Sequence, residues 1–291
     1  MSRLRGRPLA AAALAILVAL VVLSFAAPLI ETALGLDSNE ADLLQRYQPP
    51  SAEHVLGTDE IGRDVFLRLL YGGRVSLTVG FIAAVMAAAI GTVVGIVAGY
   101  FGGRFDAALM RFTDGVIALP LLPLLIVLAA VDLSKLGLTT IAQSESASLY
   151  RIIAITALFG WTTVARLVRG TTLSLKSRDF VRAAVALGAQ PVRVMAVHIL
   201  PNAVSPIIVA TTLAVGQIIL FESVLSFLGL GIQPPLPSWG NMLTNAQEVI
   251  WTAPWLAVYP GLLILLTVAS CNLLGDVLQE ILDPRSDRPK R

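Results

Sequence analysis

The stretch SLTVGFIAAVMAAAIGTVVGIVAGY, residues 76–100, runs for 25 residues without a charged side chain. A bilayer core about 30 Å thick requires about 20 mostly apolar residues in a helix. Five further segments of this kind flank the stretch, at residues 9–30, 116–131, 152–165, 203–221 and 255–274. The sequence therefore predicts an all-helical, polytopic membrane protein with six transmembrane helices.

The overall composition also indicates a membrane protein. Of the 291 residues, 56% are hydrophobic and 14% are charged, against roughly 45–50% and about 25% in soluble domains. This excess excludes an ordinary soluble enzyme. The single cysteine, Cys271, excludes a disulfide framework, and the two histidines, His54 and His198, are far apart in the sequence. We therefore expect no metal site and no cofactor bound by this chain.

The charged residues indicate the orientation of the spans. With the N-terminus inside, 15 of the 21 basic residues fall in inner segments and 12 of the 19 acidic residues fall in outer segments. Because basic residues concentrate on the cytoplasmic side of membrane proteins, both termini are predicted to be cytoplasmic. The predicted organisation is a cytoplasmic tail with the first span at 1–30, an extracytoplasmic segment at 31–75, a transmembrane domain at 76–275 with a cytoplasmic loop at 166–202 and an extracytoplasmic loop at 222–254, and a cytoplasmic tail at 276–291.

The apolar cores of the six segments contain no Asp, Glu, Lys, Arg or His. Ionisable groups inside the membrane mark proton relays and ion-coupled carriers, so their absence disfavours a carrier driven by an ion gradient. The three lysines, Lys135, Lys176 and Lys290, are not preceded by the glycines of a GxxxxGK[ST] phosphate loop. Energy for uphill transport must then enter through another protein, and we expect this chain not to be an enzyme.

The cytoplasmic loop between the fourth and fifth spans has the pattern of a short helix. Ser177 or Asp179 can cap its N-terminus and Gly188 its C-terminus. Pro191 is predicted to begin a second short helix, and Pro201 to end the loop before the fifth span. Two interpretations are open: a helix that lies on lipid headgroups, or a helix that docks into a partner protein.

Polar residues at the outer side are candidates for the mouth of a pathway. The extracytoplasmic loop, rich in glycine and proline, either closes such a mouth or presents a surface to a delivery protein, or is only a folded cap. Its tryptophans, Trp239, Trp251 and Trp255, are available as interface anchors. The candidates for the pathway or its outer gate are Glu222, Ser223, Ser226 and Asn272.

Two further patterns are interpreted as structural. One Arg among three acids, at Asp59, Glu60, Arg63 and Asp64, predicts local salt bridges and helix capping rather than a cation site. Gly91 and the glycines four and eight residues later share one face of the second span. Small residues let helix backbones approach closely in lipid, so this face is predicted to pack within the subunit or against a partner.

Three stretches resemble one family of membrane proteins. Residues 183–188, Ala-Ala, three residues and Gly, with Leu-Pro at 200–201, resemble the EAA loop of ABC importer permeases, although Arg182 stands where that family usually has Glu. The stretches GTDEIGRDVFLRLLYGGRVSL, 57–77, and SFLGLGIQPPLPSWGNML, 226–243, are similar to segments of the C-type permease subunits for dipeptides, oligopeptides and nickel. The resemblance extends over about residues 50–285.

This resemblance implies the type I ABC importer permease fold, with the ABC type-1 permease domain at 76–275. It implies a subunit that forms half of the pathway for di- or oligopeptides, or for nickel chelates or glutathione-like solutes, in the bacterial cytoplasmic (inner) membrane. The expected partners are a homologous second permease, two ATPase subunits that bind ATP and Mg, and an extracytoplasmic solute-binding protein, with no nucleic acid. The residues expected to couple to the ATPases are Asp179, Phe180, Val181, Arg182, Ala183, Ala184, Leu187 and Gly188.

Two hypotheses of other classes stay open at this point. A stand-alone channel or facilitator would conduct without any partner. A membrane scaffold would only recruit soluble proteins through its loops. Isolation of the protein in mild detergent discriminates both from an importer subunit, because only the importer subunit brings an ATPase with it.

Overall fold

The computed structural model describes residues 8–131, 144, 146–244, 246 and 248–282. Over these residues the chain is helical and forms no strand. Five helices are long and apolar enough to cross a membrane, and the bent pair α4 and α5 makes a sixth when it is counted as one span. The predicted all-helical class with six spans is confirmed.

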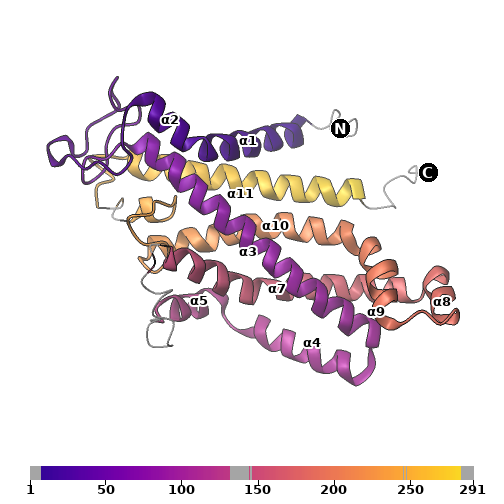
Figure 1. The fold of residues 1–291 in the computed structure, drawn as a ribbon. Helices are drawn as coiled ribbons and strands as arrows, with labels where there is room; N and C mark the ends of the chain where they lie inside the picture. Colours follow the sequence, from indigo (N-terminus) through magenta and orange to yellow (C-terminus); the bar gives the residue numbers. More distant parts are fainter. Residues whose placement is uncertain (1–7, 132–143, 145, 245, 247, 283–291) are drawn as a thin grey trace.

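The helices run back and forth between two ends of an elongated bundle (Figure 1). The first turn of α1, the last turn of α11 and the helix α8 lie at one end, here named the α8 end. Helix α2, residues 35–64 and the segment after α10 lie at the opposite end, here named the loop end. The helices are α1 Pro8–Phe25, α2 Ala27–Leu34, α3 Val65–Phe101, α4 Gly103–Ala118, α5 Leu121–Ala129, α7 Ala147–Lys176, α8 Asp179–Ala186, α9 Pro191–Arg193, α10 Leu200–Phe227 and α11 Trp255–Leu282.

The predicted third span at 116–131 is wrong in its start, and it is bent at the first of the two prolines, Pro120 and Pro123, that lie near that start. The polypeptide already turns at Gly102 into α4, and α4 and α5 meet at an angle of 81°. Leu119, at the break, has an extended backbone with φ −72° and ψ 136°. The ring of Pro120 clashes with a helical conformation of the preceding residue, so the helix must end there and restart after the proline.

The predicted end of the loop at Pro201 is also wrong. Helix continues from Pro191 through a π-helical turn, Val194–Ile199, into α10 without a break. The N–H of Leu200 bonds to the carbonyl of Met195, five residues earlier. Pro201 follows this π-helical turn directly and lies within a continuous helix, although it has no backbone N–H to donate.

The three glycines of α3 pack against α7 within the subunit. A Cβ atom at Gly91 would lie 2.5 Å from the carbonyl oxygen of Trp161, and one at Gly95 would lie 2.6 Å from that of Ala165. A Cβ atom at Gly99 would lie 2.7 Å from Thr172. The predicted close packing is therefore confirmed, and it takes place between α3 and α7.

The acidic cluster before α3 forms the predicted local network. Asp64 caps α3 by accepting a hydrogen bond from the N–H of Leu67 at 2.9 Å. Asp59 pairs with Arg63 at 2.7 Å and with the buried Arg68 at 3.4 Å. The cluster thus fixes the turn that leads into the long helix α3.

Trp239 is not an interface anchor, contrary to the prediction. It is fully buried, its ring lies against Gly73, and its indole N–H donates to the carbonyl of Leu69 at 2.9 Å. Glycine at this position of α3 leaves the space that the ring occupies. Trp251, by contrast, is 94% exposed. The loop after α10 is therefore a folded cap tied to α3, at least through Trp239.

Candidate functional site

Helix α8 projects from the α8 end of the bundle (Figure 1). Within Asp179–Ala186 only Val181 is buried, and it packs in one cluster with Val164 and Val168 of α7 and Ile96 of α3. Phe180 is 44% exposed and Leu187 is 89% exposed. A short helix held by one apolar anchor, with large apolar side chains turned outward, is suited to contact with another protein.

The C-terminus of α8 is closed by Gly188 as predicted. Gly188 has a left-handed φ of +84°, and its N–H bonds to the carbonyl of Val185 at 2.9 Å. The N–H of Ala189 bonds to the carbonyl of Ala184 at 3.0 Å. These two bonds form a Schellman motif, and glycine adopts the required φ without a steric penalty.

The predicted N-terminal cap of α8 is wrong. The residue before the helix is Arg178, and no side chain caps it. The hydroxyl of Ser177 instead donates to the carbonyl of Ser174 at 2.9 Å, at the end of α7. Only two residues separate α7 from α8, so Ser177 belongs to the end of the preceding helix.

The structure gathers the eight predicted coupling residues on one element. Asp179 through Ala184 form its first turns, and Leu187 and Gly188 form its C-terminal cap. Their anchor, Val181, shares a cluster with residues of α3, α7 and the π-helical turn. A displacement of α8 would therefore be passed to three parts of the bundle at once.

Ion pairs join α4 to α7 near this end. Arg169 of α7 donates twice to Asp106 of α4, at 2.5 and 2.6 Å, and Arg166 pairs with Asp114 at 2.5 Å. The first pair is partly buried and bidentate, whereas the second is about half exposed. Planar, bidentate contacts of this kind fix orientation as well as distance.

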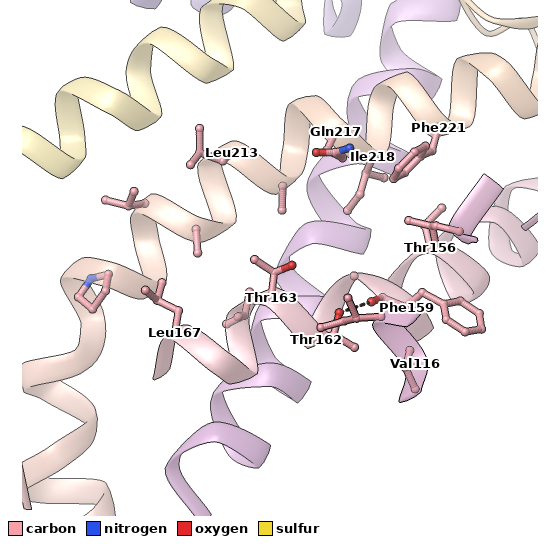
Figure 2. Close-up of a pocket in the computed structure, with 18 of the residues that line it drawn as sticks. Val116, Thr156, Phe159, Thr162, Thr163, Leu167, Leu213, Gln217, Ile218 and Phe221 are labelled. Atoms are coloured by element: carbon pink, nitrogen blue, oxygen red, sulfur yellow. Dashed lines mark hydrogen bonds between the residues drawn. The ribbon is translucent and has the colours of Figure 1, made fainter. Parts of the chain in front are cut away.

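A cavity of about 710 Å³ lies between α4, α5, α7, α10 and the last turns of α11 (Figure 2). Its wall is mainly apolar, with Phe159, Leu213 and Phe221 among the large side chains. None of the described residues that line it is charged. The polar residues on the wall are Thr156, Thr162, Thr163, Ser205, Gln217 and Gln279.

Two of these hydroxyl groups donate hydrogen bonds to backbone carbonyl groups of their own helix, α7. Thr156 donates to the carbonyl of Ile152 at 2.6 Å, and Thr162 donates to that of Phe159 at 3.1 Å. Gln217 and Thr163, in contrast, have no hydrogen-bond partner among the residues that the structure describes. The sequence did not lead us to predict either residue as part of a site. For Gln217, a signal was its position as an amide side chain within the mainly apolar segment 203–221.

None of the four predicted pathway residues lies on the cavity wall. Glu222, Ser223 and Ser226 are buried, while Asn272 is exposed on α11. Glu222 accepts hydrogen bonds from Ser76 at 3.0 Å and from Ser226 at 2.6 Å. The carboxyl group therefore points into the protein, between α3 and α10, and not into the cavity.

Ser226 and Ser76 extend this network to the folded cap, the loop after α10. Ser226 Oγ accepts a bond from the N–H of Ile232 at 2.9 Å, and Ser76 Oγ accepts one from the N–H of Trp239 at 3.2 Å. Each hydroxyl thus both donates and accepts. A buried polar network with its groups paired holds one arrangement of the chain, so Glu222 joins α3, α10 and the cap.

The chain matches the family model "Binding-protein-dependent transport system inner membrane component" over residues 91–288. It is 38% identical to the dipeptide transport system permease protein DppC of Alkalihalophilus pseudofirmus, over 97% of this chain and 88% of that protein. It is 39% identical to the oligopeptide transport system permease protein OppC of Bacillus subtilis, over 98% and 88%. It is 44% identical to the glutathione transport system permease protein GsiD of Shigella flexneri, over 81% and 74%.

Proposed function

Since the chain belongs to the family of binding-protein-dependent transport system inner membrane components and is a permease subunit of an ABC importer, we propose that its solutes are di- or oligopeptides. The observation that carries this proposal is the similarity to dipeptide and oligopeptide permeases over nearly the whole chain. The chain forms half of the translocation pathway, and the cavity of about 710 Å³ is its contribution.

Glutathione is a second candidate solute. The permease GsiD, at 44% identity over 81% of this chain, supports it. Glutathione is itself a tripeptide, so the two candidates share backbone amide chemistry and differ in size and charge. A nickel chelate, the remaining alternative from the sequence, has no comparable support among these relatives.

The proposed assembly contains a homologous second permease, two ATPase subunits and an extracytoplasmic solute-binding protein. ATP and Mg bind to the ATPases, since this chain lacks a GxxxxGK[ST] loop. The chain itself is proposed to carry no cofactor, to catalyse no reaction and to have both termini in the cytoplasm. The first turn of α1 and the last turn of α11 lie at the same end as α8 (Figure 1), which supports this orientation.

Helix α8 is proposed to dock into an ATPase subunit. Its exposed Phe180 and Leu187 supply apolar contacts, and its small Ala183 and Ala184 allow a partner to approach closely. In alternating access, ATP binding draws the two ATPases together and moves α8. Val181 transmits this motion to α7 and α3 through the cluster in which it packs.

The test is purification followed by reconstitution. The tagged chain is expressed from its own locus, isolated in mild detergent, and the proteins that accompany it are identified by mass spectrometry. Proteoliposomes are then assayed for ATP-dependent uptake of a labelled dipeptide, a labelled tripeptide and labelled glutathione. Uptake of peptides with ATPases present supports the proposal. Conduction by the chain alone would establish a channel, and absence of both ATPase and uptake would favour a scaffold.

A further inference from the structure

Gln217 places an unpaired amide group on the wall of the cavity. It lies ten residues before the end of α10 at Phe227, about 15 Å along the helix, and is exposed. Figure 2 shows Gln217 on α10 and Thr163 on α7, the two helices that face each other across the cavity. Neither side chain has a hydrogen-bond partner in the described part of the chain. A polar group inside a membrane span needs a hydrogen-bond partner, and for an exposed amide on a cavity wall that partner is water or a solute.

The wall around Gln217 encloses a hollow. Small residues such as Ala210 and Ala214 lie on it, but no neighbouring helix of this chain fills the space against them as α7 does against Gly91 and Gly95. Large side chains, Leu213, Phe221 and Leu167, also line the cavity (Figure 2). They leave a hollow of about 710 Å³, within the range of about 300–1,000 Å³ that small-molecule sites occupy.

The chemistry of the wall selects the kind of solute that can pair with it. A primary amide offers two N–H donors and a carbonyl acceptor, which match the C=O and N–H groups of a peptide backbone. Because none of the described lining residues is charged, a charge on the solute finds no counter-ion on this half of the pathway. The wall therefore matches the feature that all peptides share and is neutral toward the side chains in which they differ.

We propose that Gln217 hydrogen-bonds the backbone amide groups of a peptide in transit and is the residue through which this chain recognises its solute. The inference rests on the proposed function. Thr163, on the facing helix, provides a second polar contact. Side-chain charge is then selected elsewhere in the transporter, and one charge placed at position 217 is sufficient to create selectivity on a wall whose described residues carry no charge.

The test replaces Gln217 by a charge of either sign. The complete transporter is reconstituted with its binding protein, and uptake of Ala-Ala-Ala, Ala-Lys-Ala and Ala-Glu-Ala is measured. Each rate is divided by the wild-type rate for the same peptide, so that the preference of the binding protein cancels. Gln217→Glu is expected to favour Ala-Lys-Ala over Ala-Glu-Ala by about tenfold. Gln217→Lys is expected to give the opposite preference.

Three further variants serve as controls. Thr212 lies on the same helix, is half-buried and does not line the cavity, so Thr212→Glu and Thr212→Lys are expected to change all three rates by the same factor. Gln217→Leu removes the amide without adding charge and is expected to slow all three peptides equally, by about two- to tenfold.

The outcomes separate the inference from the function on which it rests. Assembled Gln217→Glu and Gln217→Lys transporters without any charge preference would overturn the inference and leave the proposed function intact. Loss of the second permease from the purified Gln217→Leu complex would also overturn it, because the amide would then belong to the subunit interface. Failure of the wild-type transporter to take up any of the three peptides would instead reject the proposed function.

Discussion

The two long faces of α7 differ in what they pack against. On one face, Val164, Val168 and Thr172 meet the glycine face of α3 so closely that a single Cβ atom would not fit. On the other, Thr163 and Leu167 open onto the cavity. The same helix is therefore fixed on its α3 face and free on its cavity face. The proposed mechanism uses both properties, because a motion received at α8 would be transmitted through the α3 face and a solute would occupy the space at the cavity face.

The contact between α3 and α7 is most strongly disrupted by adding a side chain at one of the α3 glycines. We expect Gly95→Leu to force α3 and α7 apart, because its Cβ atom would lie 2.6 Å from the carbonyl oxygen of Ala165. Overpacking costs about 1–3 kcal/mol or more, so the melting temperature in detergent should fall by about 5–10 °C. The control is Gly170→Leu on α7, where the added side chain meets open space. Equal melting temperatures for the two variants would contradict the packing described here.

The proposed transmission of motion from α8 to α7 and α3 is tested by substitutions in α8. Gly188→Val is expected to distort the end of α8, because a β-branched residue is strained at a φ of +84°. Uptake should fall by about tenfold, roughly 1.4 kcal/mol in the coupling step, while ATP hydrolysis and the amount of protein in the membrane are retained. An added charge in Ala184→Asp is expected to act in the same direction.

The matched control for this prediction is Gly35→Val. Gly35 also has a positive φ, +66°, and also faces open space, but it lies at the loop end. Its substitution imposes similar backbone strain away from α8 and should leave coupling unchanged. Full uptake by both Gly188→Val and Ala184→Asp would reject the docking role of α8.

Two neighbouring residues of α7 compare its faces directly. Val168 is fully buried against Gly95, whereas Leu167 lines the cavity and is 41% exposed. We expect Val168→Ala to lower the free energy of unfolding by about 1–2 kcal/mol, and Leu167→Ala to change it by no more than about 0.5 kcal/mol. Reversible denaturation in mixed micelles measures both values. A larger loss at Leu167 would mean that the cavity face is packed and not open.

The smallest expected effects concern the ion pairs that attach α4 beside the cavity. Asp106→Asn breaks the bidentate, partly buried pair with Arg169 and should cost about 1–2 kcal/mol. Asp114→Asn breaks the exposed pair with Arg166 and should cost between about 0 and 1 kcal/mol. Double-mutant cycles with Arg169→Gln and Arg166→Gln measure each coupling energy. If the exposed pair had the larger coupling energy, the contact between Asp114 and Arg166, and not that between Asp106 and Arg169, would hold α4 against α7.

Much of the fold could be predicted because it depends on local properties. Hydropathy located five of the spans and the second half of the bent one, the spacing of Gly91, Gly95 and Gly99 identified a packing face, and Gly188 marked the end of α8. Each of these features is fixed by a few neighbouring residues. Pro120 and Pro123 indicated a kink in the third span, but neither its angle of 81° nor the helical path through Pro201 could be predicted from the sequence. A proline either ends a helix, because its ring clashes with a helical preceding residue, or lies within a helix whose hydrogen bonds rearrange around it. The residue type alone does not decide between the two.

The site shows the same division. The residues of α8 could be predicted because a short helix with a glycine cap has a recognisable pattern. Glu222 and Gln217, five residues apart on α10, could not be assigned from their identities. The charged residue was expected at the mouth of the pathway, yet it is buried among serines, while the neutral amide faces the cavity.

The sequence by itself determined that this chain crosses the membrane six times, where its basic residues accumulate and which short loop helix it carries. These follow from the transfer of side chains between water and lipid, which acts on each segment separately. Only the tertiary structure decided which face of α10 is turned toward α3 and which toward the cavity. That choice depends on glycines of α3, on Trp239 and on the serines around Glu222, residues far apart in the chain that act only after the helices have come together.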